Sequence, residues 1–241
     1  HQMNIQPRPR RAHALNAVRQ RIAHAAARAH REVSEITLLA VSKMQPAEVI
    51  ESAYNAGQRC FGENYAQELA DKGSALSGHH DLQWHFIGHL QTNKVRLVAP
   101  RVVMVHTVDG ERLARELARR CDTRSEPLDV LIEINVGGEN TKSGVDPLQV
   151  EQLAGIIDTL PELRLKGLMC IPPPVEDPEL ARPAFRHVRE LRDRLGGASR
   201  LPVLSMGMTH DLEVAVEEGS TLVRVGTAIF GARKRAPKSP V

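Results

Sequence analysis

Eight short runs of β-forming residues alternate with helical patterns along most of this 241-residue chain. The runs occupy residues 38–42, 59–62, 83–88, 102–106, 130–136, 165–171, 203–206 and 222–225. Helical spacing of apolar residues fills the intervals at 47–56, 65–76, 110–121, 147–159, 179–195 and 212–218, with a weaker case at 93–98. Several of the β-type runs are apolar without alternation, as expected when both faces of a parallel sheet are buried. This repeated alternation indicates an α/β protein.

The number of strand–helix repeats points to one closed barrel. Eight repeats predict a single (β/α)8 barrel of the TIM type, and a doubly wound open sheet is the alternative. No linker rich in Gly, Pro or Ser and no shift in composition marks a second domain, so we expect one domain over residues 12–233. His1-Gln2 before Met3 resembles a tag remnant, and we expect residues 1–11 and the Pro-containing segment 234–241 to be flexible.

The N-terminal segment carries most of the positive charge of the chain. Residues 1–31 contain seven arginines and no acidic residue, whereas the net charge of the whole chain is only +3. Such a segment can contact RNA or an acidic lipid surface. Its apolar residues nevertheless fall at helical spacing, at Leu15, Val18, Ile22, Ala25 and Ala29. We therefore expect an extra N-terminal helix that docks on the barrel by this face, and neither a nucleic acid nor a membrane partner.

The cysteine, histidine and apolar content of the chain limits the compartments in which it can reside and the cofactors that it can hold. Cys60, Cys121 and Cys170 are far apart and form no CxxC pair, which favours a reducing compartment and predicts a cytoplasmic protein. No run of about 18 apolar residues occurs, so no membrane span is expected, and no signal peptide is visible. Eleven histidines are present, but the nearest group, around His85 and His89, lies across a strand end, and we expect no bound metal.

Lys43 ends the first β-type run with a single amine. Residues 36–42 are mostly apolar, and Met44-Gln45-Pro46 breaks the run. An amine at the carboxyl end of a buried strand lies on the rim where α/β barrels hold their active sites. Apolar surroundings lower the pKa of a lysine, and a neutral lysine amine forms a Schiff base with an aldehyde. The alternative is a strand-end lysine that extends to solvent.

The segments after the seventh and eighth runs have features of a phosphate site. Ser205-Met206-Gly207-Met208-Thr209 offers backbone N–H groups and two hydroxyls, and Gly226-Thr227 precedes a short helical turn at 228–231. Glycine lets a backbone approach an oxyanion closely, and barrels often bind phosphate at this position. The alternative is that both glycines only make tight turns. Together with Lys43, this site would hold a ligand that carries an aldehyde and a phosphate, such as pyridoxal 5′-phosphate (PLP) or an open-chain sugar phosphate.

Longer motifs identify a family that the chain resembles. They are Ala40-Val41-Ser42-Lys43, Phe61-Gly62-Glu63-Asn64-Tyr65, Trp84-His85-Phe86-Ile87-Gly88, Asn93-Lys94, Lys142-Ser143-Gly144, Gly167-Leu168-Met169, Ser205-Met206-Gly207-Met208 and Arg224-Val225-Gly226-Thr227-Ala228-Ile229-Phe230-Gly231. From about residue 12 to Arg233 the chain resembles the YggS/PROSC family of pyridoxal phosphate homeostasis proteins. It departs from the usual family residues at Thr209-His210, at His89 and at Gly137-Gly138. None of these is Lys43 or the Gly226-Thr227 pair, and His210 leaves the contacts beside the phosphate open.

The resemblance implies a barrel like the N-terminal domain of alanine racemase, with PLP carried by Lys43 as an internal aldimine. The phosphate would be surrounded by residues that follow the last two strands, and Arg224 would face the pyridine nitrogen. Asn64 and His85 would lie near the ring. The full cofactor-binding set that we expect is Lys43, Asn64, His85, Met169, Ser205, Met206, Arg224, Gly226 and Thr227.

An arginine at the pyridine nitrogen favours a carrier over an enzyme. Many PLP enzymes keep this nitrogen protonated with a carboxylate, so that the ring withdraws electrons from a carbanion. Arg224 cannot accept that proton. The related alanine racemases take a second base from a tyrosine of an added domain, for which we expect no room here. The two tyrosines of this chain are Tyr54, expected in the core, and Tyr65, expected near the rim.

We therefore expect a protein without catalytic residues that holds PLP as a reversible Schiff base, buffers its concentration and releases it to apo-enzymes. We expect a monomer. Three alternatives stay open: an amino-acid racemase or other PLP enzyme, a Schiff-base aldolase acting on a sugar phosphate, and a nucleic-acid-binding protein that uses the Arg-rich start. Lys94 and Lys142 are candidate second contacts for the aldehyde or the phosphate, although surface ion pairing is the favoured explanation for each. Glu63 either orients Asn64 or caps the next helix.

Overall fold

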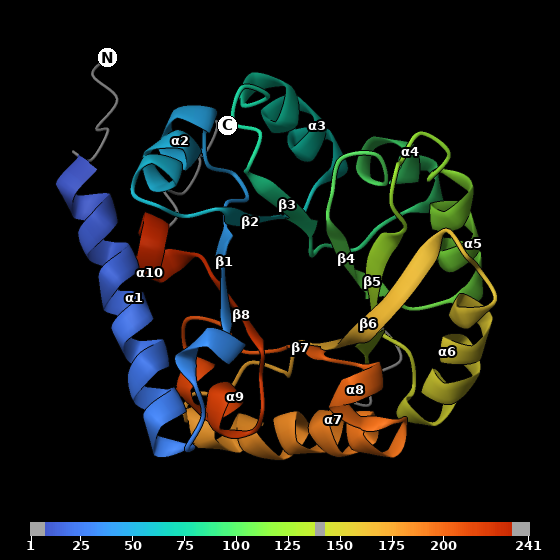
Figure 1. The fold of residues 1–241 in the computed structure, drawn as a ribbon. Helices are drawn as coiled ribbons and strands as arrows, with labels where there is room; N and C mark the ends of the chain where they lie inside the picture. Colours follow the sequence, from blue (N-terminus) through green and yellow to red (C-terminus); the bar gives the residue numbers. More distant parts are fainter. Residues whose placement is uncertain (1–7, 138–142, 233–241) are drawn as a thin grey trace, which may run out of the picture.

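Eight parallel strands close into a barrel, as the alternating pattern predicts. The computed structural model describes residues 8–137 and 143–232. The strands are β1 (Thr37–Val41), β2 (Cys60–Glu63), β3 (Gln83–Phe86), β4 (Met104–Val108), β5 (Leu128–Ile134), β6 (Leu163–Cys170), β7 (Val203–Ser205) and β8 (Leu222–Val225). Each strand pairs with its neighbours in chain order, and β8 pairs with β1 (Figure 1). The single (β/α)8 barrel is confirmed, and the open sheet is excluded.

Helices surround the ring of strands (Figure 1). They are α1 (Arg8–Arg28), α2 (Ala47–Asn55), α3 (Ala66–Ala75), α4 (Val95–Val98), α5 (Glu111–Arg119), α6 (Val150–Asp158), α7 (Arg182–Arg194), α8 (Gly197–Arg200), α9 (Leu212–Glu217) and α10 (Thr227–Phe230). Short 3-10 turns occur at Val33–Glu35, Thr92–Lys94, Pro147–Gln149 and Pro178–Ala181. Every interval predicted as helical contains a helix. Two predicted helices, α6 and α7, are preceded by 3-10 turns that begin at Pro147 and Pro178. Proline is tolerated at these positions because the first N–H groups of a helix have no intrahelical acceptor.

The barrel interior contains polar groups as well as apolar ones. The larger apolar cluster fills the space between the strands and the helices. Two smaller clusters contain the inward-facing residues Leu39, Val41, Ile87 and Leu222, and Met104, Leu131 and Met169. The buried polar residues His85, His106, Ser205 and Arg224 occupy the same inward-facing positions of β3, β4, β7 and β8. The barrel interior therefore holds one guanidinium and two imidazoles, and the Glu133 carboxyl group of β5 is buried as well.

The N-terminal helix α1 docks on α9 and α10 by the predicted apolar face. Leu15, Val18, Ile22 and Ala25 are at most 3% exposed. Ala29 is half-buried and lies just beyond the helix. The arginines of this segment bind the body of the protein as well. Their partners include carboxylates and carbonyl oxygens of residues 209–229, so α1 is part of the scaffold.

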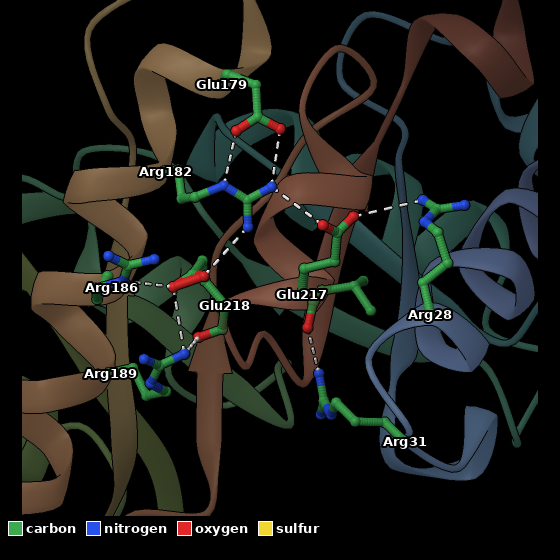
Figure 2. Close-up of polar contacts among 9 residues, drawn as sticks. Arg28, Arg31, Glu179, Arg182, Arg186, Arg189, Glu217 and Glu218 are labelled. Atoms are coloured by element: carbon green, nitrogen blue, oxygen red, sulfur yellow. Dashed lines mark hydrogen bonds and ion pairs between the residues drawn. The ribbon is translucent and has the colours of Figure 1, made fainter.

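An outer ion-pair network joins α1, α7 and α9 (Figure 2). It consists of Arg28, Glu179, Arg182, Arg186, Arg189, Glu217 and Glu218. Arg182 is its centre, with nitrogens 2.8 Å from Glu179, 3.0 Å from Glu217 and 3.2 Å from Glu218. Arg31 donates beside it to the carbonyl oxygens of Val216 and Ser220.

One part of the predicted flexible N-terminus is ordered. Residues 8–11 form the first turn of α1, and the Arg11 side chain is buried. Helix α1 thus begins within the segment 1–11 that we expect to be flexible, and Arg11 has partners on α10 that no local pattern reveals. The predicted tag remnant, the tail 234–241 and Lys142 lie outside the described residues. Within the described part of the chain, no helix has the length and apolar character needed to cross a bilayer.

Candidate functional site

A cavity of about 540 Å³ opens at the carboxyl end of the barrel strands. Lys43 follows β1 and lines this cavity together with Arg224 from β8 and Gly226 and Thr227 after it. β1 and β8 are paired neighbours, with Leu39 in register with Arg224. The remaining lining residues are Val41, Gln45, Ile171, Pro172, Pro173, Pro174, Val175, Met208, Thr209, His210, Asp211, Phe230 and Gly231. Lys43 and the predicted phosphate site at Gly226 and Thr227 therefore lie on the same wall of one cavity.

The backbone on both sides of Lys43 is held by residues of α3. Lys72 donates from Nζ to the carbonyl oxygen of Ser42 at 2.8 Å. Glu68 accepts the backbone N–H of Met44 at 2.6 Å. Met44 has a φ of 62°, in the left-handed region that is unfavourable for a residue with a side chain. These two contacts stabilise a strained turn that directs Lys43 towards the cavity.

Glu63 lies beneath this turn and is fully buried. Its Oε1 atom is 2.5 Å from Lys72 Nζ and accepts a hydrogen bond from the Ser42 hydroxyl at 3.1 Å. Its Oε2 atom has no hydrogen-bond partner among the described residues. Burial raises the pKa of Glu63 to about 7, although Lys72 opposes this shift. Glu63 thus supports the Lys43 turn, and the contacts show neither of the two roles that the sequence suggested.

Arg224 is a buried cation that forms no ion pair with a carboxylate among the described residues. It is 2% exposed, and its Nη1 atom donates to Ser205 Oγ at 2.6 Å and its Nη2 atom to the carbonyl oxygen of Cys170 at 2.9 Å. Burial lowers the pKa of Arg224, while the more distant carboxylates of Asp211 and Glu133 oppose this shift. A buried charge that lacks a direct ion pair is costly, and a guanidinium has five N–H donors, so it has capacity for a ligand that accepts hydrogen bonds.

The two glycines of the predicted phosphate seat differ. Gly207 has a φ of 101°, and an added Cβ would lie 2.6 Å from the Cβ of Ala215, so the turn itself requires glycine. Gly226 has a negative φ of −114°, and its added Cβ would meet no protein atom closer than 3.4 Å, in Val41. The turn explanation is therefore correct for Gly207. At Gly226 neither the backbone nor the packing demands glycine, and a missing side chain leaves room for a ligand beside α10.

Hydroxyl groups from both loops meet next to Gly226. Thr227 Oγ1 donates to Thr209 Oγ1 at 3.2 Å. The first N–H groups of α10, beginning with that of Thr227, have no partners within the helix. The N–H groups of Met206 and Met208 are already bonded, to the carbonyl oxygen of Leu222 and to the Asp211 side chain. The expectation of free N–H groups at Met206 and Met208 was therefore wrong.

Helix α1 supports these two loops from the outside. Arg11 donates to the carbonyl oxygen of Ile229 at 2.5 Å, and its guanidinium lies over the ring of Phe230, 5.1 Å from the centroid. Arg21 donates to the carbonyl oxygen of Thr209 at 2.7 Å and pairs with Glu213. The basic N-terminal segment thus holds the loops that line the cavity.

The other predicted site residues lie deeper or elsewhere. Met169 is buried in an interior apolar cluster, and Met206 packs between the barrel and the helices. Ser205 is fully buried below Arg224. His85 contacts His106 and lines a second cavity, of about 780 Å³, at the opposite end of the barrel. Their contact with a cofactor stays a prediction.

Asn64 follows β2 and carries a buried Oδ1 atom without a partner among the described residues. Gly88 allows the Asn64 backbone to approach, because an added Cβ at Gly88 would lie only 2.1 Å from the Asn64 carbonyl oxygen. His210, one of the departures from the family pattern, lines the Lys43 cavity and contacts the carbonyl oxygen of Glu176. Within residues 8–137 and 143–232, no three His, Cys, Asp or Glu side chains are arranged to hold a metal ion.

Sequence reasoning missed Lys72, Glu68 and Arg11. Lys72 and Glu68 occupy one face of α3 at i, i+4 spacing, which usually indicates a surface ion pair. The apolar residues around Lys72, such as Leu69, gave the only hint that its amine is buried.

Known proteins share this architecture over nearly the whole chain. Residues 14–234 match the family described as alanine racemase, N-terminal domain. The fold is also that of alanine racemase from Corynebacterium glutamicum, at a TM-score of 0.69 and 19% identity, covering 94% of this chain and 62% of that one. Identity is much higher to proteins named pyridoxal phosphate homeostasis protein. It is 49% over 222 residues for Aquifex aeolicus (91% of this chain, 97% of the relative) and 47% over 233 residues for Escherichia coli K12 (94% and 98%).

PipY of Synechococcus elongatus PCC7942, solved with PLP bound, superimposes at a TM-score of 0.76 with 34% identity, covering 89% of this chain and all of PipY. The chain therefore belongs to the alanine racemase N-terminal domain family and, within it, to the pyridoxal phosphate homeostasis proteins.

Proposed function

We propose that this protein binds PLP as a Schiff base on Lys43 and buffers or delivers it, without robust catalysis of its own. The observation that carries the proposal is the shared cavity of Lys43, Arg224, Gly226 and Thr227. PLP supplies an aldehyde that condenses reversibly with amines. PipY, a relative that covers most of this chain, has been solved with this cofactor bound.

The residues present fit PLP at both of its ends. Lys43 lines the cavity that would receive the aldehyde, and the space beside Gly226, which a Cβ would fill, suits the phosphate. The hydroxyls of Thr209 and Thr227 lie there as donors. Arg224 has donor capacity for the pyridine nitrogen, whose lone pair accepts a hydrogen bond. A bound anion would also compensate the buried guanidinium.

The same geometry argues against strong catalysis. Arg224 cannot keep the pyridine nitrogen protonated, so the ring would be a weak electron sink. A racemase also needs a second base opposite the lysine. Tyr54 is half-buried and its hydroxyl contacts Asp81, which raises the pKa of Tyr54. It lies at the last turn of α2, outside the residues that line the Lys43 cavity. Tyr65 is 53% exposed at the start of α3 and is also outside the lining.

Replacement of Lys43 by alanine tests the proposal. We expect the purified protein to be yellow and to lose the Schiff-base absorbance in Lys43→Ala. Lys94→Ala, at an exposed lysine after β3, is the matched control and should retain it. Borohydride reduction followed by peptide mass spectrometry should locate the reduced pyridoxyl group on Lys43. An unchanged spectrum in Lys43→Ala would reject the assignment.

Release and turnover separate a carrier from its alternatives. A carrier should transfer PLP to an apo-enzyme or to a competing amine, and should show no turnover across a panel of amino acids. Turnover that is lost in Lys43→Ala would instead identify a PLP enzyme. A colourless protein in which borohydride traps a sugar phosphate would identify an aldolase. The three free cysteines are consistent with the reducing compartment that we propose for it.

A further inference from the structure

Four buried polar side chains form one continuous hydrogen-bonded chain across the barrel. Arg224 Nη1 is 2.6 Å from Ser205 Oγ, Ser205 Oγ is 2.8 Å from His106 Nδ1, and His106 Nε2 is 2.9 Å from His85 Nδ1. The four residues come from β8, β7, β4 and β3, and none is more than 5% exposed. The chain begins at the Lys43 cavity, which Arg224 lines, and ends at the opposite cavity, which His85 lines.

Hydrogen-bond accounting fixes the position of every proton in this chain. Arginine only donates, so Ser205 Oγ accepts from Arg224. The hydroxyl hydrogen of Ser205 is fully buried, and His106 Nδ1 is the acceptor within its reach among the described residues. Buried donors in native proteins find an acceptor, so Ser205 donates to His106 Nδ1.

The proton positions on the two imidazole rings follow from the direction of the Ser205 hydrogen bond. Burial lowers the pKa of His85 to about 4 and holds that of His106 well below its usual value, so both rings are neutral. A neutral His106 that accepts at Nδ1 carries its proton on Nε2 and donates it to His85 Nδ1. His85 then carries its own proton on Nε2, on the side of the opposite cavity. All hydrogen bonds run in one direction, an arrangement in which neighbouring bonds strengthen one another.

We propose that His85 and His106 are positioning residues that hold the Arg224 guanidinium in its orientation towards the Lys43 cavity. Without them Ser205 could turn its hydroxyl away, and Arg224 would retain the carbonyl oxygen of Cys170 as its fixed partner. His85 thereby acts on the ligand end from the far side of the barrel. The ligand readouts of this inference rest on the proposed binding of PLP, whereas the proton positions do not.

The first test uses the ligand-free protein and needs no variant. Long-range ¹H–¹⁵N NMR spectra of the histidine rings report which nitrogen carries the proton. We expect His85 and His106 to be neutral with the proton on Nε2, unchanged from pH 8 down to about 5.5. A proton on Nδ1 of His106, or titration of either ring near pH 6.5, would overturn the inference.

The second test compares two substitutions of the same size at His85. In His85→Asn the amide oxygen takes the place of Nδ1 and accepts from His106, whereas His85→Leu places a methyl group there. We expect His85→Leu to bind PLP about tenfold more weakly than the wild type, with a shifted pH midpoint of the bound absorbance, and His85→Asn to recover most of that affinity. Leu131→Val, in the same interior, controls for loosened packing and should move neither readout.

The outcomes distinguish this inference from the proposed function. Wild-type affinity and an unshifted absorbance midpoint in folded His85→Leu would reject the positioning role. A wild-type protein that binds no PLP would reject the proposed function, and the NMR spectra would still decide the proton positions. If His85→Leu does not fold, the ligand-free spectra of the wild type and of His85→Asn still test the chain, because a proton on Nδ1 of His106 in either protein contradicts it.

Discussion

Arg182 and Arg224 are the same residue type in opposite environments. Arg182 lies in the outer ion-pair network and contacts three carboxylates near solvent (Figure 2). Arg224 lies in the barrel interior and donates to one hydroxyl and one carbonyl oxygen. Exposed ion pairs each contribute little, and several together tie helices to one another. A buried cation without a direct ion pair costs stability. The comparison indicates that Arg182 serves the scaffold, and it supports the proposal that Arg224 serves a ligand.

Substitution of Arg224 should have the largest effect on the ligand. In Arg224→Met we expect the affinity for PLP to fall about a hundredfold, because the donor that we propose for the pyridine nitrogen is lost. The unfolding free energy of the ligand-free protein should stay the same or rise, since a buried charge that forms no direct ion pair is removed. PLP titration by absorbance and urea unfolding measure the two quantities. If ligand-free Arg224→Met were destabilised by several kcal/mol, Arg224 would stabilise the fold as Arg182 does, which would contradict the comparison.

Acidification should destabilise the interior through its histidines. An unfolded chain takes up a proton on each imidazole near pH 6.5, whereas His85 does so only near pH 4 in the barrel. Between these values the unfolded chain binds more protons, so the unfolding free energy falls as the pH falls. For His85 the loss is about 2 kcal/mol between pH 6.5 and 5. His85→Asn should have a shallower pH dependence in urea unfolding, and identical slopes would contradict the buried neutral state.

Arg11 lies on the outer helix α1, and its substitution should nevertheless change the affinity of the cavity for PLP. It belongs to α1 yet contacts Ile229 and Phe230 at the cavity. We expect Arg11→Met to lower PLP affinity about tenfold, because α10 loses its support. Arg19→Met is the matched control: Arg19 lies on the same helix and contacts Gln58, away from the cavity loops. Equal PLP affinities in the two variants would show that α1 does not support the site.

Loss of Arg182 should be a stability effect alone. We expect Arg182→Met to lower the unfolding free energy by about 1 kcal/mol and to leave PLP affinity unchanged, because three partly exposed ion pairs are lost. The effect should shrink in high salt, which screens exposed charges. Arg115→Met, which breaks one exposed pair with Glu111, should cost less. A change in PLP affinity in Arg182→Met would connect the outer network to the cavity.

Part of the site was predictable because strand ends converge in a barrel. Lys43, Arg224, Gly226 and Thr227 were all expected on one rim, and they line one cavity. Their positions follow from strand order and from the polar residues at strand ends. The functions of Ser205 and His85 were harder to predict, since both are inward-facing and the sequence does not show how deep in the barrel each lies. Ser205 and His106 are 99 residues apart and meet across the interior.

The sequence alone determined the architecture of this protein: apolar periodicity placed eight strands and the helices between them, and short strand–helix repeats allow few topologies other than a barrel. Tertiary structure decided which polar groups pair. Register and strand orientation brought Lys72 beneath the Lys43 turn. They also gave Arg182 ion pairs with three carboxylates, whereas Arg224 forms no ion pair with a described carboxylate. Such pairings depend on angstrom distances between residues far apart in the chain, and local patterns carry no information about those distances.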